Sequence, residues 1–128
     1  MYSKYQGPVK LIIGKSKIPG AGYGVFAKSS IRKGELLEIC PFVEVHKDMI
    51  YDQSNILQNY VFKSHCNPKG ALVVFGYGSI FNHSKTPNVF YSINGRDQNR
   101  LLDFIALKDV SAGTELCTFY APKHSANQ

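Results

Sequence analysis

The sequence predicts a mostly-β domain built from several small sheets. Short runs rich in Val, Ile, Leu, Phe and Tyr recur along the chain, and glycine-containing turns separate them. Only one segment carries a convincing helix start signal. With 128 residues, of which 44% are hydrophobic, the chain is long enough to form one domain with a real core.

Each expected strand corresponds to one apolar run. In chain order the runs are 9–13 (VKLII), 24–27 (GVFA), 35–45 (ELLEICPFVEV), 71–75 (ALVVF), 88–93 (NVFYSI), 101–107 (LLDFIAL) and the turn plus strand 112–120 (AGTELCTFY). Pro41 is expected to bend the third run, and Asn94-Gly95 predicts a hairpin between the fifth and sixth. Asp48 is the candidate cap of a short helix that continues to about Asn59.

Charge and cysteine content exclude several function classes. The formal charge is +6, but the Lys and Arg residues are scattered from Lys4 to Lys123 without a basic run. A nucleic-acid-binding β-domain would rest on charge alone, so we expect no direct nucleic-acid binding. Three cysteines without a CxxC pair argue against a disulfide framework and a zinc ribbon, and indicate an intracellular protein.

No membrane or export signal is expected either. The first ten residues lack the apolar core of a signal peptide. No stretch approaches the roughly 20 apolar residues of a membrane span.

Three segments contain glycine or polar residues that are unusual beside the apolar runs that they adjoin. PGAGYGVFA (19–27) places three glycines before a strand; a tight turn explains this, whereas a dinucleotide fingerprint needs other spacing and a following helix. FNHS (81–84) ends an apolar segment with Asn82 and His83, which need hydrogen-bond partners if they are buried. ELCTFYA (115–121) reads as a core strand that ends in Tyr120.

Metal and nucleophile chemistry have little support. The residues His46, His65, Cys66 and His124 lack metal-ligand spacing, so we expect no metal site. A nucleophilic pair of Cys117 with His83 stays open from the sequence, although no protease signature accompanies it.

Together the three segments resemble the SET-domain protein lysine methyltransferases. The resemblance is carried by Gly22-Tyr23-Gly24 with VFA, by Phe81-Asn82-His83-Ser84 with Pro87-Asn88, and by Gly113-Thr114-Glu115-Leu116 with Tyr120. IRKGELL (31–37) and NYVF (59–62) also resemble segments of the family's sequences. The resemblance covers about residues 9–121 and is closest in manner to the minimal, stand-alone SET proteins of large DNA viruses.

The resemblance implies the SET (β-clip) fold, with several small sheets, one or two short helices and a knot-like C-terminal crossing. In that crossing the NHS segment and the final Tyr strand pass one another. Residues 1–128 would form a single domain, with a flexible tail at 122–128.

The resemblance also implies the chemistry, which is methyl transfer from S-adenosylmethionine to the ε-amine of a lysine in a histone or another basic protein. The backbone of Gly22, Tyr23 and Gly24 would meet the cofactor. Asn82 and His83 would be buried with partners and would present backbone groups to its adenine. Tyr120 corresponds to the family's catalytic Tyr, and Tyr60 and Tyr120 would line the lysine channel.

An acidic stretch suggests how a basic substrate could be attracted. Five of the nine acids lie at Glu35, Glu38, Glu44, Asp48 and Asp52, ahead of Tyr60. They could form an anionic landing surface in which Glu44 and Asp48 bind the substrate peptide. The alternative is an ordinary solvated face.

The segment after Tyr120 departs from the family pattern. Only APKHSANQ follows, with neither a cysteine cluster nor a second Tyr. We therefore expect a second copy of the chain to close the site, as a homodimer. The alternative function is a SET-like module that binds cofactor or peptide without turnover. The number of methyl groups transferred stays open.

Overall fold

The computed structural model describes residues 8–51, 56–64, 67–94 and 101–119. Its strands are β1 (Leu11–Lys15), β2 (Tyr23–Ala27), β3 (Leu36–His46), β4 (Phe62–Lys63), β5 (Gly70–Val74), β6 (Asn82–His83), β7 (Val89–Asn94), β8 (Leu101–Ala106) and β9 (Glu115–Thr118). Three 3-10 turns complete the described elements: η1 (Lys47–Met49), η2 (Ile56–Asn59) and η3 (Tyr77–Ile80).

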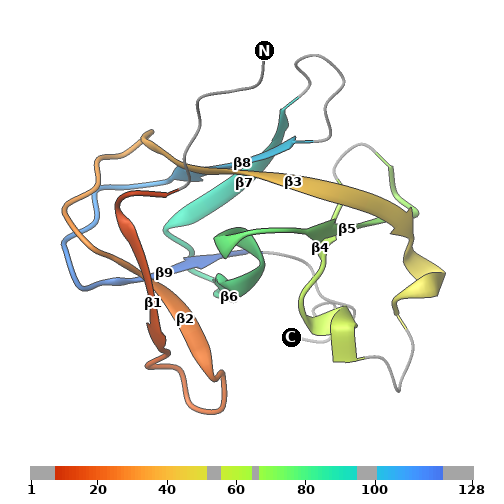
Figure 1. Cartoon of the computed structure of the whole chain (residues 1–128), viewed down its shortest axis with the longest axis horizontal. Helices are drawn as coiled ribbons and strands as arrows, with labels where there is room; N and C mark the ends of the chain where they lie inside the picture. Colours follow the sequence, from red (N-terminus) through yellow and green to blue (C-terminus); the bar gives the residue numbers. More distant parts are fainter. Residues whose placement is uncertain (1–7, 52–55, 65–66, 95–100, 120–128) are drawn as a thin grey trace.

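The strands form one strongly bent path rather than a flat sheet (Figure 1). Neighbours along this path follow the order β1-β2-β9-β7-β8-β3-β5-β4, and β6 lies beside β9. The strand pairs β1–β2, β7–β8 and β4–β5 are antiparallel, and each joins strands that follow one another in the chain. The predicted mostly-β fold of small sheets is confirmed.

The long strand β3 belongs to two sheets. Its first half, up to Pro41, pairs with β8, and its second half, from Phe42, pairs with β5. Proline has no backbone N–H to continue a ladder, and the Pro41 carbonyl instead accepts a 3.0 Å bond from the amide of Phe75. The bend predicted at Pro41 thus corresponds to a change of strand partner.

The core lies inside this bent path and is dominated by aromatic rings. Phe62, Phe81 and Phe104 are each at most 1% exposed. The ring of Phe104 lies 5.0 Å from that of Phe81 and 5.6 Å from that of Phe62, and Tyr91 packs edge-on against Phe62 at 4.8 Å. Such tilted and edge-on contacts add to the apolar burial of each ring.

Turn η3 packs directly on this aromatic core. Gly78 is buried, and a Cβ there would collide with the ring of Phe104 and lie 3.0 Å from Sγ of Cys40. Just before it, Gly76 adopts a φ of 130°, which side chains rarely adopt. Two glycines therefore let η3 lie flat on the core and lead into β6.

The predicted C-terminal crossing brings β6 and β9 together as parallel neighbours, Asn82 opposite Cys117 and His83 opposite Thr118. The Asn88 side chain clamps the same strand. Its Nδ2 donates to the carbonyl of Glu115 at 3.0 Å, and its Oδ1 accepts from the amide of Cys117 at 2.8 Å. Residues 82–88 and 115–118 therefore lie side by side.

Two local predictions were wrong. The helix expected from Asp48 to Asn59 is interrupted: η1 and η2 are separate 3-10 turns, and His46 rather than Asp48 caps the first one. Nδ1 of His46 accepts from the amide of Asp48 at 3.1 Å. The first strand begins at Leu11, two residues later than predicted.

No helix in the described ranges is long and apolar enough to cross a membrane.

Candidate active site

The glycine-rich segment forms the turn between β1 and β2. The amide of Ser16 donates to the carbonyl of Gly22 at 2.7 Å and closes the turn. Gly20 and Gly22 have φ of 78° and 76°, a region that disfavours side chains. Apart from its chain neighbours, no atom lies within 4 Å of the position that a Cβ of Gly22 would take, so the space beside its α-carbon is open.

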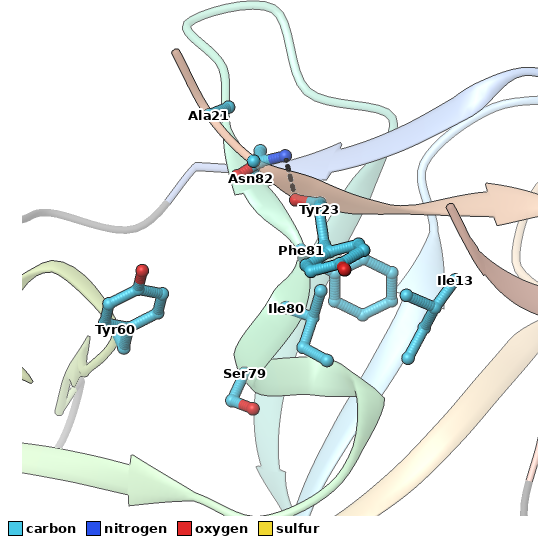
Figure 2. A pocket seen from close by; sticks show the side chains of 9 residues that line it. Ile13, Ala21, Tyr23, Tyr60, Ser79, Ile80, Phe81 and Asn82 are labelled. Carbon is cyan, nitrogen blue, oxygen red and sulfur yellow. Dashed lines mark hydrogen bonds between the residues drawn. The ribbon is translucent and has the colours of Figure 1, made fainter. Parts of the chain in front are cut away.

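A cavity of about 300 Å³ opens beside this turn. It is lined by Ile13, Ala21, Gly22, Tyr23, Tyr60, Ser79, Ile80, Phe81 and Asn82. Figure 2 shows Tyr60 on one side of Ile80 and Ser79, with Tyr23 and Ile13 on the other. The cavity thus joins the β1–β2 turn, the η2 end and the η3–β6 segment.

Four of the predicted site residues meet at this cavity, namely Gly22, Tyr23, Tyr60 and Asn82. The Tyr23 side chain is 70% exposed and that of Tyr60 is 51% exposed. Both rings are therefore free to contact a ligand. The Tyr60 amide donates to the carbonyl of Leu57 at 2.9 Å. This bond fixes the backbone of Tyr60 at the end of η2.

Asn82 is half-buried and forms two hydrogen bonds through one nitrogen. Its Nδ2 donates to the carbonyl of Tyr23 at 3.0 Å, shown in Figure 2, and to Oε2 of Glu115 at 2.9 Å. The resemblance predicted that Asn82 is buried and has partners; the structure shows the two partners, but the residue is only half-buried. The neighbouring His83 is half-buried too, and its ring lies 4.9 Å from that of Phe119.

Gly24 does not line the cavity, and packing explains its identity. A Cβ on Gly24 would collide with Oε2 of Glu115 and lie 3.1 Å from Nδ2 of Asn82. Its predicted contact with the cofactor stays a prediction.

Tyr120 lies outside the described residues, as does the tail that follows it. β9 ends at Thr118, beside His83, and Phe119 is the last residue described. The catalytic role predicted for Tyr120 therefore stays a prediction.

Glu44 and Asp48, predicted to bind substrate, do not line this cavity. Oε2 of Glu44 accepts from Nδ2 of Asn67 at 2.7 Å, at a separate polar hollow. The Asp48 side chain is 80% exposed, 3.6 Å from Nδ1 of His46. Glu38 is only 4% exposed, so it cannot belong to an anionic landing surface.

Two alternative chemistries can be compared with the described residues. Within the described ranges, no group of three His, Cys, Asp or Glu side chains could hold a metal ion, but His65, Cys66 and His124 lie outside those ranges, so the absence of a metal site stays a prediction. Burial, and secondarily the charge of Glu115, raise the pKa of Cys117 to about 11. A thiol with such a pKa is protonated near pH 7, which argues against a nucleophilic pair of Cys117 with His83.

Sequence reasoning assigned Glu115 no role beyond its place in a motif. Its Oε2 accepts from Oγ of Ser16 at 2.7 Å, and its Oε1 accepts from the amide of Lys17 at 3.0 Å. Together with Asn82, this carboxylate connects segments almost a hundred residues apart. A single acid in a strand gives no periodic signal that could have shown this.

Comparison with known proteins identifies the family. The sequence model of the SET domain matches residues 22–121. A histone-lysine N-methyltransferase from Schizosaccharomyces pombe, specific for H3 lysine-37, is 30% identical over 101 residues, which cover 77% of this chain. The aligned region spans 66% of that relative, just under two thirds of its length.

Solved structures share the fold. A Plasmodium falciparum protein provisionally assigned as a histone methyltransferase has a TM-score of 0.69 and 28% identity, over 91% of this chain and 95% of its own. An active polycomb repressive complex 2 has a TM-score of 0.71 and 25% identity, over 89% of this chain and 15% of its own.

A Chaetomium thermophilum Polycomb Repressive Complex 2 that is bound to S-adenosylmethionine has a TM-score of 0.69 and 23% identity, over 90% of this chain and 15% of its own. SET methyltransferases use this cofactor as methyl donor. The SET domain model matches most of the chain, and the Plasmodium falciparum structure shares the fold over 91% of it; the chain belongs to the SET domain family.

Proposed function

We propose that this chain is a protein lysine methyltransferase that uses S-adenosylmethionine. The observation that carries the proposal is the shared cavity, where Gly22, Tyr23 and Asn82, the predicted cofactor residues, meet Tyr60, the predicted lysine-channel residue. Family membership and the methyltransferase relatives support the same activity.

The residues present fit the cofactor. The cavity of about 300 Å³ lies at the lower end of the range of ligand pockets. Gly22 leaves open space beside its α-carbon, and Asn82 adds a polar amide to a largely apolar wall. When bound, S-adenosylmethionine supplies an electrophilic methyl group on a sulfonium sulfur.

The protein's own task is to deliver a neutral amine. A free lysine has a pKa of about 10.4, so on the order of one amine in a thousand is neutral near pH 7. The cavity walls formed by Ile13, Ile80 and Phe81 disfavour the charged ammonium, because an apolar wall cannot solvate it. A strong base is therefore unnecessary, and water can accept the released proton.

Alignment is the second task. Reacting atoms must approach to about 3–3.5 Å along the transfer direction. We assign this positioning to the rings of Tyr60 and Tyr120. The half-exposed Tyr60 ring in the cavity lining supports its part of the assignment.

Substrate and assembly are proposed at a coarser level. The fission yeast relative acts on histone H3, so we propose a histone or another basic protein as substrate. The homodimer, the intracellular location, the single domain over residues 1–128 and the substrate contacts of Glu44 and Asp48 stay predictions. His83 and Gly24 stay predicted cofactor residues.

Transfer of labelled methyl groups tests the proposal. Wild-type protein, Tyr120→Phe and the control Asp109→Ala are incubated with methyl-labelled S-adenosylmethionine and core histones or a ribosomal protein mixture. We expect labelled lysine with wild type and Asp109→Ala, and loss of label with Tyr120→Phe. Cofactor binding without any methyl transfer would instead support the non-catalytic SET-like module. If neither cofactor binding nor methyl transfer is found, both the enzyme and the binding module are refuted.

A further inference from the structure

We propose that Glu115 is a positioning residue that holds the cofactor cavity in shape, an inference that rests on the proposed function. Its carboxylate lies beside the cavity rather than in its lining. It fixes two cavity walls at once, the β1–β2 turn on one side and Asn82 on the other.

The β1–β2 turn is held by both carboxylate oxygens. Oε2 accepts from the Ser16 hydroxyl at 2.7 Å, and Oε1 accepts from the Lys17 amide at 3.0 Å. The Ser16 Oγ in turn accepts from the amide of Ile18 at 3.0 Å. Hydrogen bonds to an ionised acceptor are about twice as strong as neutral ones, so one side chain suffices to anchor the turn that carries Gly22.

The same carboxylate sets the orientation of the Asn82 amide. Only the nitrogen can donate to Oε2 of Glu115 and to the carbonyl of Tyr23, which lie 2.9 Å and 3.0 Å from it. The amide oxygen must therefore face away from Glu115. Asn82 lines the cavity, so Glu115 and the Tyr23 carbonyl together fix the orientation of an amide in the cavity wall.

The fold reserves space for this carboxylate. Phe26 of β2 lies opposite Glu115 of β9, and Gly24, two residues away, shares that face of the strand. Any side chain at Gly24 would collide with Oε2 of Glu115. The position of the Glu115 carboxylate therefore explains why residue 24 is a glycine.

Two measurements on the whole protein test the role. The first needs no ligand: amide hydrogen exchange at Lys17 in wild type, Glu115→Ala, Glu115→Gln and the control Asp109→Ala. Asp109 is a suitable control because its Oδ1 also accepts a backbone amide across a long sequence separation, from Lys33 at 2.8 Å, but away from the cavity.

We expect exchange at Lys17 to rise at least ~10-fold in Glu115→Ala and less in Glu115→Gln, which keeps one acceptor oxygen. Asp109→Ala should leave exchange at Lys17 unchanged. Equal protection of Lys17 in wild type and Glu115→Ala would overturn the inference, whether or not the protein is an enzyme.

The second measurement is titration calorimetry with S-adenosylmethionine, together with steady-state kinetics. Glu115→Ala should raise Kd and KM for the cofactor ~10–100-fold while kcat at saturation changes less than 3-fold. A merely unfolded fraction would lower kcat and leave KM unchanged, and that result would overturn the inference.

A double-mutant cycle shows whether Glu115 acts through Asn82. The effects of Glu115→Ala and Asn82→Ala on Kd should be clearly less than additive, whereas full additivity would contradict the coupling. If wild type binds no S-adenosylmethionine at all, the proposed function fails, and the exchange at Lys17 still decides the positioning role.

Discussion

Substituting Gly24 by Ala gives a sharp test of the network around Glu115. The new Cβ would collide with Oε2 of Glu115, so the Glu115 carboxylate must move. Oε2 accepts from Ser16 at 2.7 Å and from Asn82 at 2.9 Å, and both bonds would be weakened. Hydrogen bonds to charged groups contribute about 1.5–3 kcal/mol each, and partial exposure reduces this, so we expect a loss of about 2–3 kcal/mol.

The alanine also has a stabilising effect, because it restricts the unfolded chain by about 0.4–1 kcal/mol. The net loss in the free energy of unfolding is then about 1–2.6 kcal/mol. For a chain of this length each kcal/mol corresponds to about 3–5 °C, so Tm should fall by about 3–13 °C.

Gly14→Ala is the matched control. Gly14 lies directly opposite Gly24 in the β1–β2 ladder, and a Cβ there would meet the Phe26 ring at an ordinary 3.4 Å. Its Tm should be unchanged or slightly raised. Thermal unfolding followed by circular dichroism, with urea titration as a second probe, measures both variants. If Gly24→Ala proves as stable as Gly14→Ala, the carboxylate is not held in this place.

Three further predictions concern the rest of the structure. Gly78→Ala should lower the free energy of unfolding by about 2–3 kcal/mol, since its Cβ would collide with the fully buried Phe104; an unchanged Tm would contradict this packing. Burial raises the pKa of Glu38 above its ordinary 4.5, so the folded protein holds this proton more tightly and stability falls as pH rises above about 4.5. Glu38→Gln should flatten Tm measured from pH 4 to 8, and parallel profiles for variant and wild type would refute this. Asn88→Ala should lower the free energy of unfolding, measured by urea titration, by about 2 kcal/mol, because the amide of Cys117 and the carbonyl of Glu115 lose their side-chain partner. An unchanged urea midpoint would mean that the Asn88 side chain is not needed for stability.

The strands could be predicted where local pattern and tertiary contacts agree. β2, β5, β7, β8 and β9 follow apolar runs bounded by glycine or polar turns, and their positions agree with the sequence to within a residue or two. β4 and β6 have two residues each, too short to show any period. They form because β5 and β9 are beside them, which no local signal reveals.

The site was predictable as a set of motifs and not as a network. Gly22, Tyr23 and Asn82 were identified by resemblance, and they do meet at one cavity. The role of Glu115 depends on contacts with Ser16 and Lys17 that only the folded register creates. Likewise Glu38 is buried beside Leu37 because a register shift between Leu36 and Glu38 breaks the alternation of β3, which period-two reasoning cannot foresee.

The place of β9 in the sheet has a consequence for how the protein is made. β9 pairs with β2, near the other end of the chain, and with β6. A ribosome finishes β2 and β6 long before it reaches residues 115–118, so the edge of β2 emerges without its neighbour. The sheet beside the cavity can therefore close only after β9 has been made, and until then the open edge of β2 is available for pairing with other polypeptides.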